Sequence, residues 1–378
     1  MQSVRNTMNI TPQQDQALRA VSTWYNDPHS APFFYLGGFA GTGKTTLAKH
    51  FAASVSGTVF CAFTGKAALV MRQKGCTNAS TIHSLIYTFD DEAPPGTMRF
   101  IRNPLSPITT AKLVIVDECS MVNRQLGEDL LSFGKKVIVL GDPAQLPPVE
   151  GAGFFTLGEP DFLLTKIHRQ AAESPIIRLS QIVREGGKLK VGKYGESAVI
   201  PVSKLDWREL AARDQVLVGM NKTRQLAITK IRERHGRTLA VETDDRLICL
   251  KNDRAKMLLN GSMWTVLAVR EYGRSMRLTL ASQDGLAEAV DIYTRPEMFD
   301  GRESELSPAQ RRNLDEFTFA EAITVHKAQG SQWDDVAVID ESKAFREDAR
   351  AHLYTAITRA ASRVLIAIPQ AASSLGGI

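Results

Sequence analysis

A glycine-rich segment with a lysine and three threonines is the first feature of this sequence that could do chemistry. It reads GFAGTGKTT, with an apolar run before it and a helical pattern after it. That context is what a phosphate-binding loop requires, because its backbone N–H groups must close around phosphate oxygens at a helix N-terminus. We therefore expect a nucleoside triphosphate to bind here. The residues expected to contact it are Gly38, Ala40, Gly41, Thr42, Gly43, Lys44, Thr45 and Thr46.

Two adjacent acids end another apolar run, VIVDE, and suit the metal and the water that triphosphate hydrolysis needs. Asp117 is expected to hold Mg²⁺ together with the hydroxyl of Thr45. Glu118 is placed to polarise a water molecule. A nucleotide kinase would not need this second carboxylate, because its nucleophile is a hydroxyl or another phosphate. The two acids could also be surface charge, but the phosphate-binding loop favours hydrolysis.

A glutamine stands in a stiff turn, GDPAQLPPV, after a third apolar run. The Gln145 amide can donate to a γ-phosphate oxygen and accept from the attacking water at once. Because loss of the γ-phosphate would remove that contact, we predict that Gln145 converts hydrolysis into motion. Arg169 and Arg359 lie further along the chain. Each could stabilise charge on the γ-phosphate across a cleft, or be an ordinary surface arginine.

The elements that must position these residues are strands and helices in alternation. Strand patterns occur in FFYLGG, TVFCAF, KLVIVDE and KKVIVLGD. Helix patterns begin after the N-cap-like Thr11, within TGKTTLAKHFAASV, and at Lys66. Such an alternation, with strands buried on both faces, predicts a parallel sheet whose functional loops lie at the carboxyl ends of the strands.

A second α/β region is predicted to begin near Leu163, with a strand and a long helix in QVLVGMNKTRQLAITKIRERHG. Its basic end, Arg232 to Arg237, is expected to be a solvated helix face. Short alternating runs between Leu239 and Asp300 predict an antiparallel β module inserted in this region. The α/β pattern then resumes. Between Ser84 and Lys112 the sequence fits either a hairpin or a surface loop.

Composition sets wide bounds on the class of protein. The 378 residues allow two or more domains, and the net charge of +5 indicates a polyanionic partner only weakly. Four widely spaced cysteines without a CxxC pair argue against a zinc site or a disulfide framework and favour inert thiols. Because no apolar run could span a bilayer or serve as a signal segment, we expect a cytoplasmic protein without a membrane partner.

Eight short motifs in a fixed order make the chain resemble the superfamily 1 helicases, and most closely their RecD/Dda branch. The motifs are GFAGTGKT, FTGKAA, TIHSL, VDECSM, GDPAQLPPV, IHRQ, TVHKAQGSQW and YTAITRA. The resemblance implies an α/β fold with two RecA-like P-loop motor domains that contain parallel sheets. It also implies a small β-hairpin pin insertion and an SH3-like β-barrel insertion. The expected boundaries are 1–85 and 108–160 for the first motor domain, 86–107 for the pin, 161–238 and 313–378 for the second motor domain, and 239–312 for the SH3-like module.

The same resemblance implies roles for individual residues. Gln14 is expected to read the adenine edge, with Gln13 as the alternative register. Gln332, where relatives often carry glutamate, is expected to alter nucleotide affinity or selectivity. Gln145 would contact the γ-phosphate, and Arg169 and Arg359 would come from the second motor domain.

A further set of residues is implied to line the DNA track. Two of them, His83 and His326, could instead be core histidines. Phe100 is the choice for a wedge on the pin. The residues of the track are Thr64, Lys66, His83, Thr324, His326 and Lys327.

The function expected from these features is that of a monomeric DNA helicase that uses ATP and Mg²⁺. It would move 5′ to 3′ on single-stranded DNA and open forked duplex DNA, with the polarity implied by the resemblance alone. The alternatives are a translocase that does not separate strands and a nucleic-acid-binding module that uses ATP only as a switch. Glu118 argues against the switch, because a switch without turnover does not need it.

Overall fold

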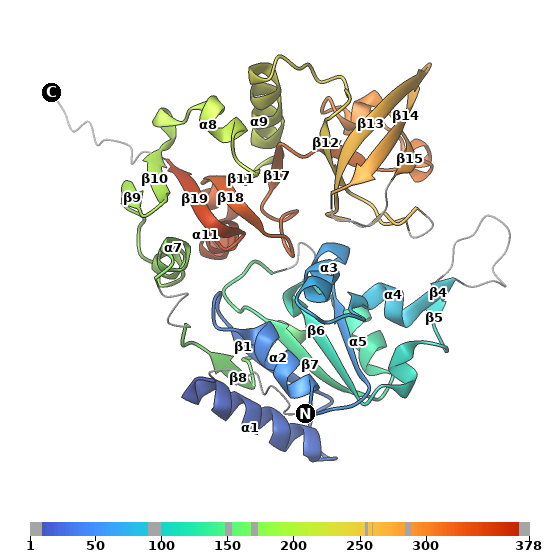
Figure 1. Cartoon of the computed structure of the whole chain (residues 1–378), viewed down its shortest axis with the longest axis vertical. Coiled ribbons are helices and arrows are strands. Elements are labelled where there is room, and N and C mark those ends of the chain that lie inside the picture. Colours follow the sequence, from blue (N-terminus) through green and yellow to red (C-terminus); the bar gives the residue numbers. More distant parts are fainter. Residues whose placement is uncertain are drawn as a thin grey trace, which may run out of the picture. The chain divides into compact units, whose positions relative to one another are not determined.

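The computed structural model describes residues 10–89, 100–147, 153–167, 173–253, 256–258, 260–283 and 289–369 (Figure 1). These residues form two compact units. The described part of the first unit falls within residues 1–63, 70–143 and 147–172. That of the second falls within 64–69, 144–146 and 173–378. Each unit contains a six-stranded sheet, and the second unit also contains a five-stranded antiparallel sheet.

The sheet of the first unit is parallel throughout, in the order β3-β2-β6-β7-β1-β8. This confirms the parallel sheet predicted from the alternation of strands and helices. The strand β8 pairs with β1, so the first sheet still continues at Leu163, where the second α/β region was expected to begin. The strands are β1 (Phe33–Gly38), β2 (Thr58–Ala62), β3 (Ser80–Thr81), β6 (Leu113–Asp117), β7 (Lys136–Gly141) and β8 (Phe162–Leu164).

Alternating side chains of the central strands supply two cores, one on each face of this sheet. Leu113 and Ile115 pack with the core of α1 (Pro12–Asn26) and α2 (Lys44–Ala52). Val114 and Val116 point to the opposite core. Fully burying an aliphatic side chain contributes about 1.5–3 kcal/mol. Because both faces are covered, the strands read as continuous apolar runs in the sequence.

The first unit also contains two shorter helices, α4 and α5, and a pair of short antiparallel strands, β4 and β5. The opposite core includes residues of α4 (Ile82–Ile86) and α5 (Arg124–Leu131). The strands β4 (Tyr87–Phe89) and β5 (Phe100–Arg102) pair antiparallel. A capping box joins Thr11 and Gln14 at the start of α1, with proline in the first turn, as the sequence predicted.

The six-stranded sheet of the second unit has the order β17-β11-β18-β19-β10-β9, and only its edge strand β9 runs antiparallel to its neighbour. The strands are β9 (Gly192–Tyr194), β10 (Ser197–Pro201), β11 (Gln215–Val218), β17 (Ala322–Thr324), β18 (Trp333–Ile339) and β19 (Ala360–Ile368). The helices of this unit are α3 (Gly65–Gln73, in part), α7 (Pro175–Arg184), α8 (Trp207–Ala211), α9 (Asn221–Arg234), α10 (Pro308–Arg312) and α11 (Ala349–Ile357).

The antiparallel sheet has the order β15-β14-β13-β12-β16. Its strands are β12 (Arg246–Cys249), β13 (Met263–Tyr272), β14 (Ser275–Ser282), β15 (Val290–Thr294) and β16 (Phe317–Phe319). The antiparallel module predicted from the alternating runs is therefore present. Its fifth strand comes from beyond residue 312, the boundary expected for the module. The phenylalanines of β16 are fully buried, and this burial explains why the strand joins the sheet.

Two further predictions concern single features. The four cysteines, Cys61, Cys76, Cys119 and Cys249, are free and buried, as expected for inert thiols. Among the residues that the structure describes, none of the helices is both long enough and apolar enough to cross a bilayer.

Candidate functional site

Three neighbouring strands of the first unit end at the same edge of the sheet. The order β6-β7-β1 is parallel, so the carboxyl ends at Asp117, Gly141 and Gly38 lie next to one another. The phosphate-binding loop, the acid pair and the start of the GDPAQLPP turn therefore converge. No sequence pattern predicts this strand order, although each of the three segments carries residues expected to do chemistry. In open α/β sheets, ligands bind at this edge.

The loop between β1 and α2 has the backbone that only glycine adopts readily. Gly41 and Gly43 have φ angles of 78° and 82°. At Gly38 a Cβ atom would lie 2.7 Å from Thr42 Oγ1, so even alanine would collide there. The helix α2 begins at Lys44 within this segment and contacts β1, β6 and β7, and Figure 1 shows it lying against the sheet near β1 and β7. The loop therefore directs its N–H groups from a helix N-terminus, the arrangement that holds a phosphate.

Two side chains of the loop are held by short hydrogen bonds. Lys44 Nζ donates to the carbonyl of Gly38 at 2.6 Å and to that of Phe39 at 3.3 Å. Thr45 Oγ1 donates to the carboxylate of Asp117 at 2.9 Å. A hydroxyl and a carboxylate so close are the two oxygen ligands that a magnesium ion beside a triphosphate takes. The predicted metal pair is thus brought together where the first turn of α2 meets the carboxyl end of β6.

Glu118 occupies a strained backbone position immediately after β6. Its φ and ψ angles are 53° and 47°, in the left-handed region that non-glycine residues rarely adopt. Its backbone N–H donates to Asp117 Oδ1 at 2.9 Å, so this residue helps to orient the Asp117 carboxylate. Strain of this kind costs about 1–3 kcal/mol and is found mostly at functional sites.

The two candidate adenine-reading glutamines have different surroundings. The Gln14 side chain is 2% exposed and donates to the carbonyl of Thr42 at 3.1 Å, within the phosphate-binding loop. The Gln13 amide instead joins α1 to the chain after β8. It donates to Leu163 O and Thr165 Oγ1, and it accepts from the N–H groups of Thr165 and Lys166. Gln14 is therefore the one attached to the loop.

Several residues expected on the DNA track lie together in the second unit. Thr64 belongs to this unit, and its Oγ1 lies 2.7 Å from the position that a Cβ atom at Gly330 would occupy. Gly330 follows His326 and Lys327 in the turn after β17, and its φ angle is 76°. Thr324 ends β17 and is buried. The FTGKAA and TVHKAQG motifs are thus in contact, although 260 residues separate Thr64 from Thr324 in the sequence.

The two candidate histidines differ in exposure. His83 is exposed on α4, so the core alternative is wrong for this residue. His326 is half-buried. Its ring centroid lies 5.4 Å from that of Phe345 and 5.9 Å from that of His352. Phe345 and His352 stack with ring centroids 4.0 Å apart. The buried Nε2 of His352 has no hydrogen-bond partner among the described residues.

Acid is expected to destabilise the second unit through His352. Burial, with a smaller effect from the charge of His326, lowers the pKa of His352 from 6.5 to about 4. Between those values the unfolded chain binds a proton that the folded protein does not, so stability falls as the pH drops. From pH 7 to pH 5 we expect a loss of about 2 kcal/mol. Urea denaturation at the two pH values, with His352→Phe alongside, measures it. An equal loss in both proteins would rule out His352 as its source.

The remaining predicted residues are distributed as follows. Arg359 is 5% exposed, and its Nη1 donates to the carbonyl of Ser331 at 3.2 Å. Gln145 is half-buried in the segment Ala144–Leu146, which belongs to the second unit. Gln332 is exposed. Arg169 and the side chain of Phe100 lie outside the described residues, although Phe100 begins β5.

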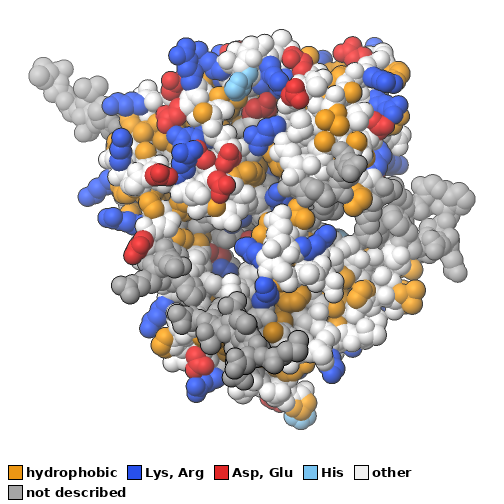
Figure 2. All heavy atoms as spheres, viewed as in Figure 1, with side chains coloured by type: hydrophobic (Ala, Val, Ile, Leu, Met, Phe, Trp, Pro, Cys, Tyr) orange, Lys and Arg blue, Asp and Glu red, His pale blue; other side chains and the backbone are white. Residues whose placement is uncertain are grey.

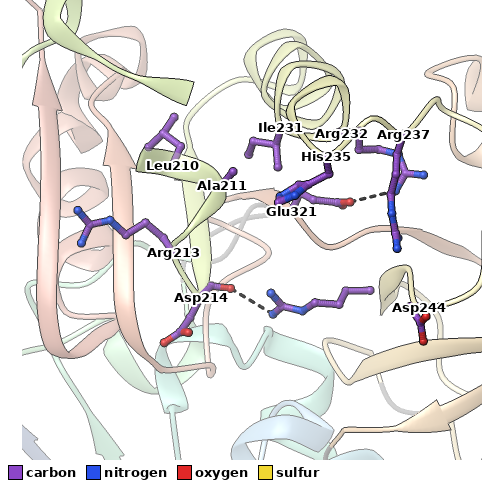
Figure 3. A pocket seen from close by; sticks show the side chains of 11 residues that line it. Leu210, Ala211, Arg213, Asp214, Ile231, Arg232, His235, Arg237, Asp244 and Glu321 are labelled. Atoms are coloured by element: carbon purple, nitrogen blue, oxygen red, sulfur yellow. Dashed lines mark hydrogen bonds and ion pairs between the residues drawn. The ribbon is translucent and has the colours of Figure 1, made fainter. Parts of the chain in front are cut away.

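A pocket of about 390 Å³ in the second unit contains none of the predicted nucleotide residues (Figure 3). Arg213, Arg232, Arg237 and Arg246 line it together with Asp214, Asp244 and Glu321, so its charges are mixed. Figure 2 likewise shows Lys and Arg interspersed with Asp and Glu on the visible face. Surface charge therefore does not mark a nucleic-acid site in this view.

Arg232 corrects the expectation of a solvated basic helix end. Its side chain is 1% exposed and makes a bidentate pair with Asp245, which is fully buried. Glu321 accepts a third bond at 3.0 Å, drawn in Figure 3, and the guanidinium lies 3.8 Å above the ring of Phe319. The charge can be buried because two acids outside its own helix, Asp245 and Glu321, neutralise it.

Comparisons with known proteins agree with the motifs. A model of the family described as AAA domain matches residues 9–204, just over half of the 378 residues. A model described as UvrD-like helicase C-terminal domain matches residues 319–367. The first covers the phosphate-binding loop and the acid pair, and the second covers the TVHKAQG and YTAITRA segments.

Two curated relatives are named ATP-dependent DNA helicases. The ATP-dependent RecD2 DNA helicase of Deinococcus radiodurans is 30% identical over 365 residues, which cover 87% of this chain and 46% of that protein. The ATP-dependent DNA helicase dda of enterobacteria phage T4 is 31% identical over 173 residues, which cover 40% of this chain and 37% of that protein. The chain thus matches less than half the length of either relative.

The fold is also that of solved helicases. The Pif1 helicase from Bacteroides, crystallised with ADP-AlF3 and single-stranded DNA, superposes with a TM-score of 0.56 at 18% identity, covering 95% of this chain and 92% of that one. At such identity the likeness establishes an α/β helicase fold with a parallel-sheet RecA-like core. The match over residues 9–204 shows that the chain belongs to the AAA-domain family, and its similarity to the RecD2 and dda helicases agrees with the RecD/Dda-like superfamily 1 helicases.

Proposed function

We propose that this chain is an ATP-driven motor that moves 5′ to 3′ on single-stranded DNA and separates the strands of a forked duplex. The observation that carries the proposal is the convergence of the phosphate-binding loop, Asp117 and Glu118 at one edge of the first sheet. Proteins similar to this chain are named ATP-dependent DNA helicases, which supports the same activity.

The nucleotide site is assigned to residues whose contacts suit a bound magnesium triphosphate. Lys44 would exchange the carbonyls of Gly38 and Phe39 for phosphate oxygens, since its ammonium group already lies against the phosphate-binding loop. Thr45 and Asp117 would hold Mg²⁺. Gln14 is the better candidate for the adenine edge, because its amide contacts the phosphate-binding loop at Thr42, whereas the Gln13 amide contacts Leu163, Thr165 and Lys166.

ATP, when bound, supplies the γ-phosphoryl group whose transfer to water releases free energy. Glu118 orients the attacking water and accepts its proton, because its carboxylate follows directly on the metal-binding Asp117. Gln145 contacts the γ-phosphate side, and Arg169 and Arg359 stabilise the charge that develops there. Gln332 tunes the affinity for the nucleotide. These roles follow from the motifs.

The DNA track is assigned to the joined FTGKAA and TVHKAQG segments. Thr64 and Lys66 from the first, with Thr324, His326 and Lys327 from the second, would hold the backbone of one strand. The exposed His83 would extend this track. The contact between Thr64 and Gly330 supports the assignment, because both motifs must face the same strand.

The two insertions are assigned from their position in the chain. The β4–β5 ladder, between residues 86 and 107, is proposed to be the strand-separating pin, with Phe100 as its wedge. The five-stranded antiparallel sheet is proposed to be the SH3-like module of residues 239–312, extended by β16. The motor domains would take the remaining boundaries, 1–85 with 108–160 and 161–238 with 313–378, except that β8 belongs to the first sheet.

Strand separation on three substrates tests the proposal. Forked duplexes with a 5′ tail, with a 3′ tail or with no tail are incubated with ATP and Mg²⁺, and Glu118→Gln protein serves as the blank. We expect unwinding only when the 5′ tail is present. Unwinding only with the 3′ tail would contradict the polarity. If no duplex opened while single-stranded DNA still stimulated hydrolysis, the chain would be a translocase that does not separate strands.

A further inference from the structure

Two buried side chains hold the backbone next to Gln145. Gln329 Nε2 donates to the carbonyl of Leu146 at 3.1 Å, and the N–H of Leu146 donates to Thr355 Oγ1 at 2.9 Å. Leu146, Gln329 and Thr355 are 1%, 4% and 0% exposed. All three belong to the second unit. Both peptide groups that flank Leu146 are therefore fixed, including the one that it shares with Gln145.

The two partners of Leu146 come from different elements of the second unit. Gln329 lies in the turn after β17, and Thr355 lies in α11. Since the groups are buried, losing either partner would leave a backbone donor or acceptor without water to replace it. Apolar contacts alone would let the Leu146 backbone shift. Two directional hydrogen bonds, one to its N–H and one to its carbonyl, oppose such a shift.

The same two elements are joined again through Arg359. Its Nη1 donates to the carbonyl of Ser331, two residues after Gln329, and Arg359 itself follows four residues after Thr355. The contacts therefore close a ring that runs from Leu146 to Thr355, to Arg359, to Ser331, to Gln329 and back to Leu146. A displacement of the Ala144–Leu146 segment must move the ring or break one of its bonds.

We propose that Gln329 and Thr355 are positioning residues that couple the state of the nucleotide, sensed at Gln145, to Arg359 and to the DNA-track residues beside Gln329. This rests on the proposed function. The ring transmits the movement because Gln329 follows His326 and Lys327 within a single turn. Neither positioning residue touches the nucleotide or the DNA in this scheme. Their removal should therefore uncouple the motor without stopping hydrolysis.

Thr355→Val tests the coupling, because valine keeps the shape of threonine and removes the acceptor for the Leu146 N–H. We expect DNA-stimulated ATP hydrolysis to continue with a KM for ATP within about twofold of wild type. The number of ATP molecules consumed per base pair opened should rise about tenfold, as expected from the loss of one buried hydrogen bond. Thr355→Ser, which retains the hydroxyl, should restore the wild-type ratio.

Gln329→Met provides an independent second variant, since it removes the donor to the Leu146 carbonyl with little change of volume. Far-UV circular dichroism and a urea denaturation curve check that each variant is folded. If hydrolysis and unwinding fell in proportion in both variants, the ratio would stay at its wild-type value and the coupling role would be overturned. If wild-type protein showed no DNA-stimulated hydrolysis at all, the proposed function would fail first, and the coupling role with it.

Discussion

Glu118→Gln is expected to lower the rate of ATP hydrolysis by about 10²–10⁴-fold, the range in which a positioned general base contributes. Glutamine has the size of glutamate and can occupy the same left-handed backbone position after β6. Its amide cannot accept the proton of the attacking water. The contact between Thr45 and Asp117 does not involve the Glu118 side chain, so binding of the magnesium nucleotide should persist.

Two measurements separate these effects. Steady-state phosphate release gives the rate of hydrolysis, and titration with a fluorescent ATP analogue gives the affinity. The matched control is Glu128→Gln on α5, where an exposed glutamate pairs with the exposed Arg124. The control should hydrolyse ATP at the wild-type rate. Near-normal hydrolysis by Glu118→Gln would assign the base to another residue.

The candidate site of the first unit could be predicted because its signals are local. The loop around Lys44 needs glycine at fixed spacings, and Asp117 and Glu118 end an apolar strand, so each segment can be identified alone. Their meeting at one edge follows from parallel pairing, which the alternation of strands and helices already indicated. Their direct adjacency also requires the strand order β6-β7-β1, which no local sequence pattern predicts.

Short strands account for the errors in the domain limits. The strands β8 and β16 have three residues each, too few for a period to be read. Leu164 of β8 completes the core beneath the first sheet, while Phe317 and Phe319 of β16 complete the core of the second unit. Tertiary packing, rather than local preference, decided which sheet each strand joined.

Long-range polar contacts were also beyond the reach of sequence patterns. Gln329 and Thr355 lie within motifs that the sequence does display, yet their partner Leu146 is 183 and 209 residues away. Arg232 belongs to a basic run that resembles a solvated helix end, and one of its acids, Glu321, is 89 residues distant. A charge pattern read along one helix cannot reveal neutralisation by another segment.

Arg232→Met is expected to destabilise the second unit by about 3–5 kcal/mol, the usual cost of removing one partner of a buried ion pair. Methionine fills much of the volume of arginine and keeps the packing against Phe319. Asp245, whose side chain is fully buried, would keep the contact with Arg237 and the N–H of Glu242 but lose its bidentate partner. The carbonyls of Thr238 and Ala240 would lose their donors as well.

Urea unfolding followed by tryptophan fluorescence measures this effect, because three of the four tryptophans, Trp207, Trp264 and Trp333, belong to the second unit. Lys230→Met is the control, since Lys230 lies on the same helix but pairs with Glu233 in solvent, and it should change stability by less than about 1 kcal/mol. Combining Arg232→Met with Asp245→Asn should restore part of the loss, because the stranded charge is then removed. A double variant whose loss equalled the sum of the two single losses would mean that Arg232 acts through its backbone contacts and packing rather than through its charge.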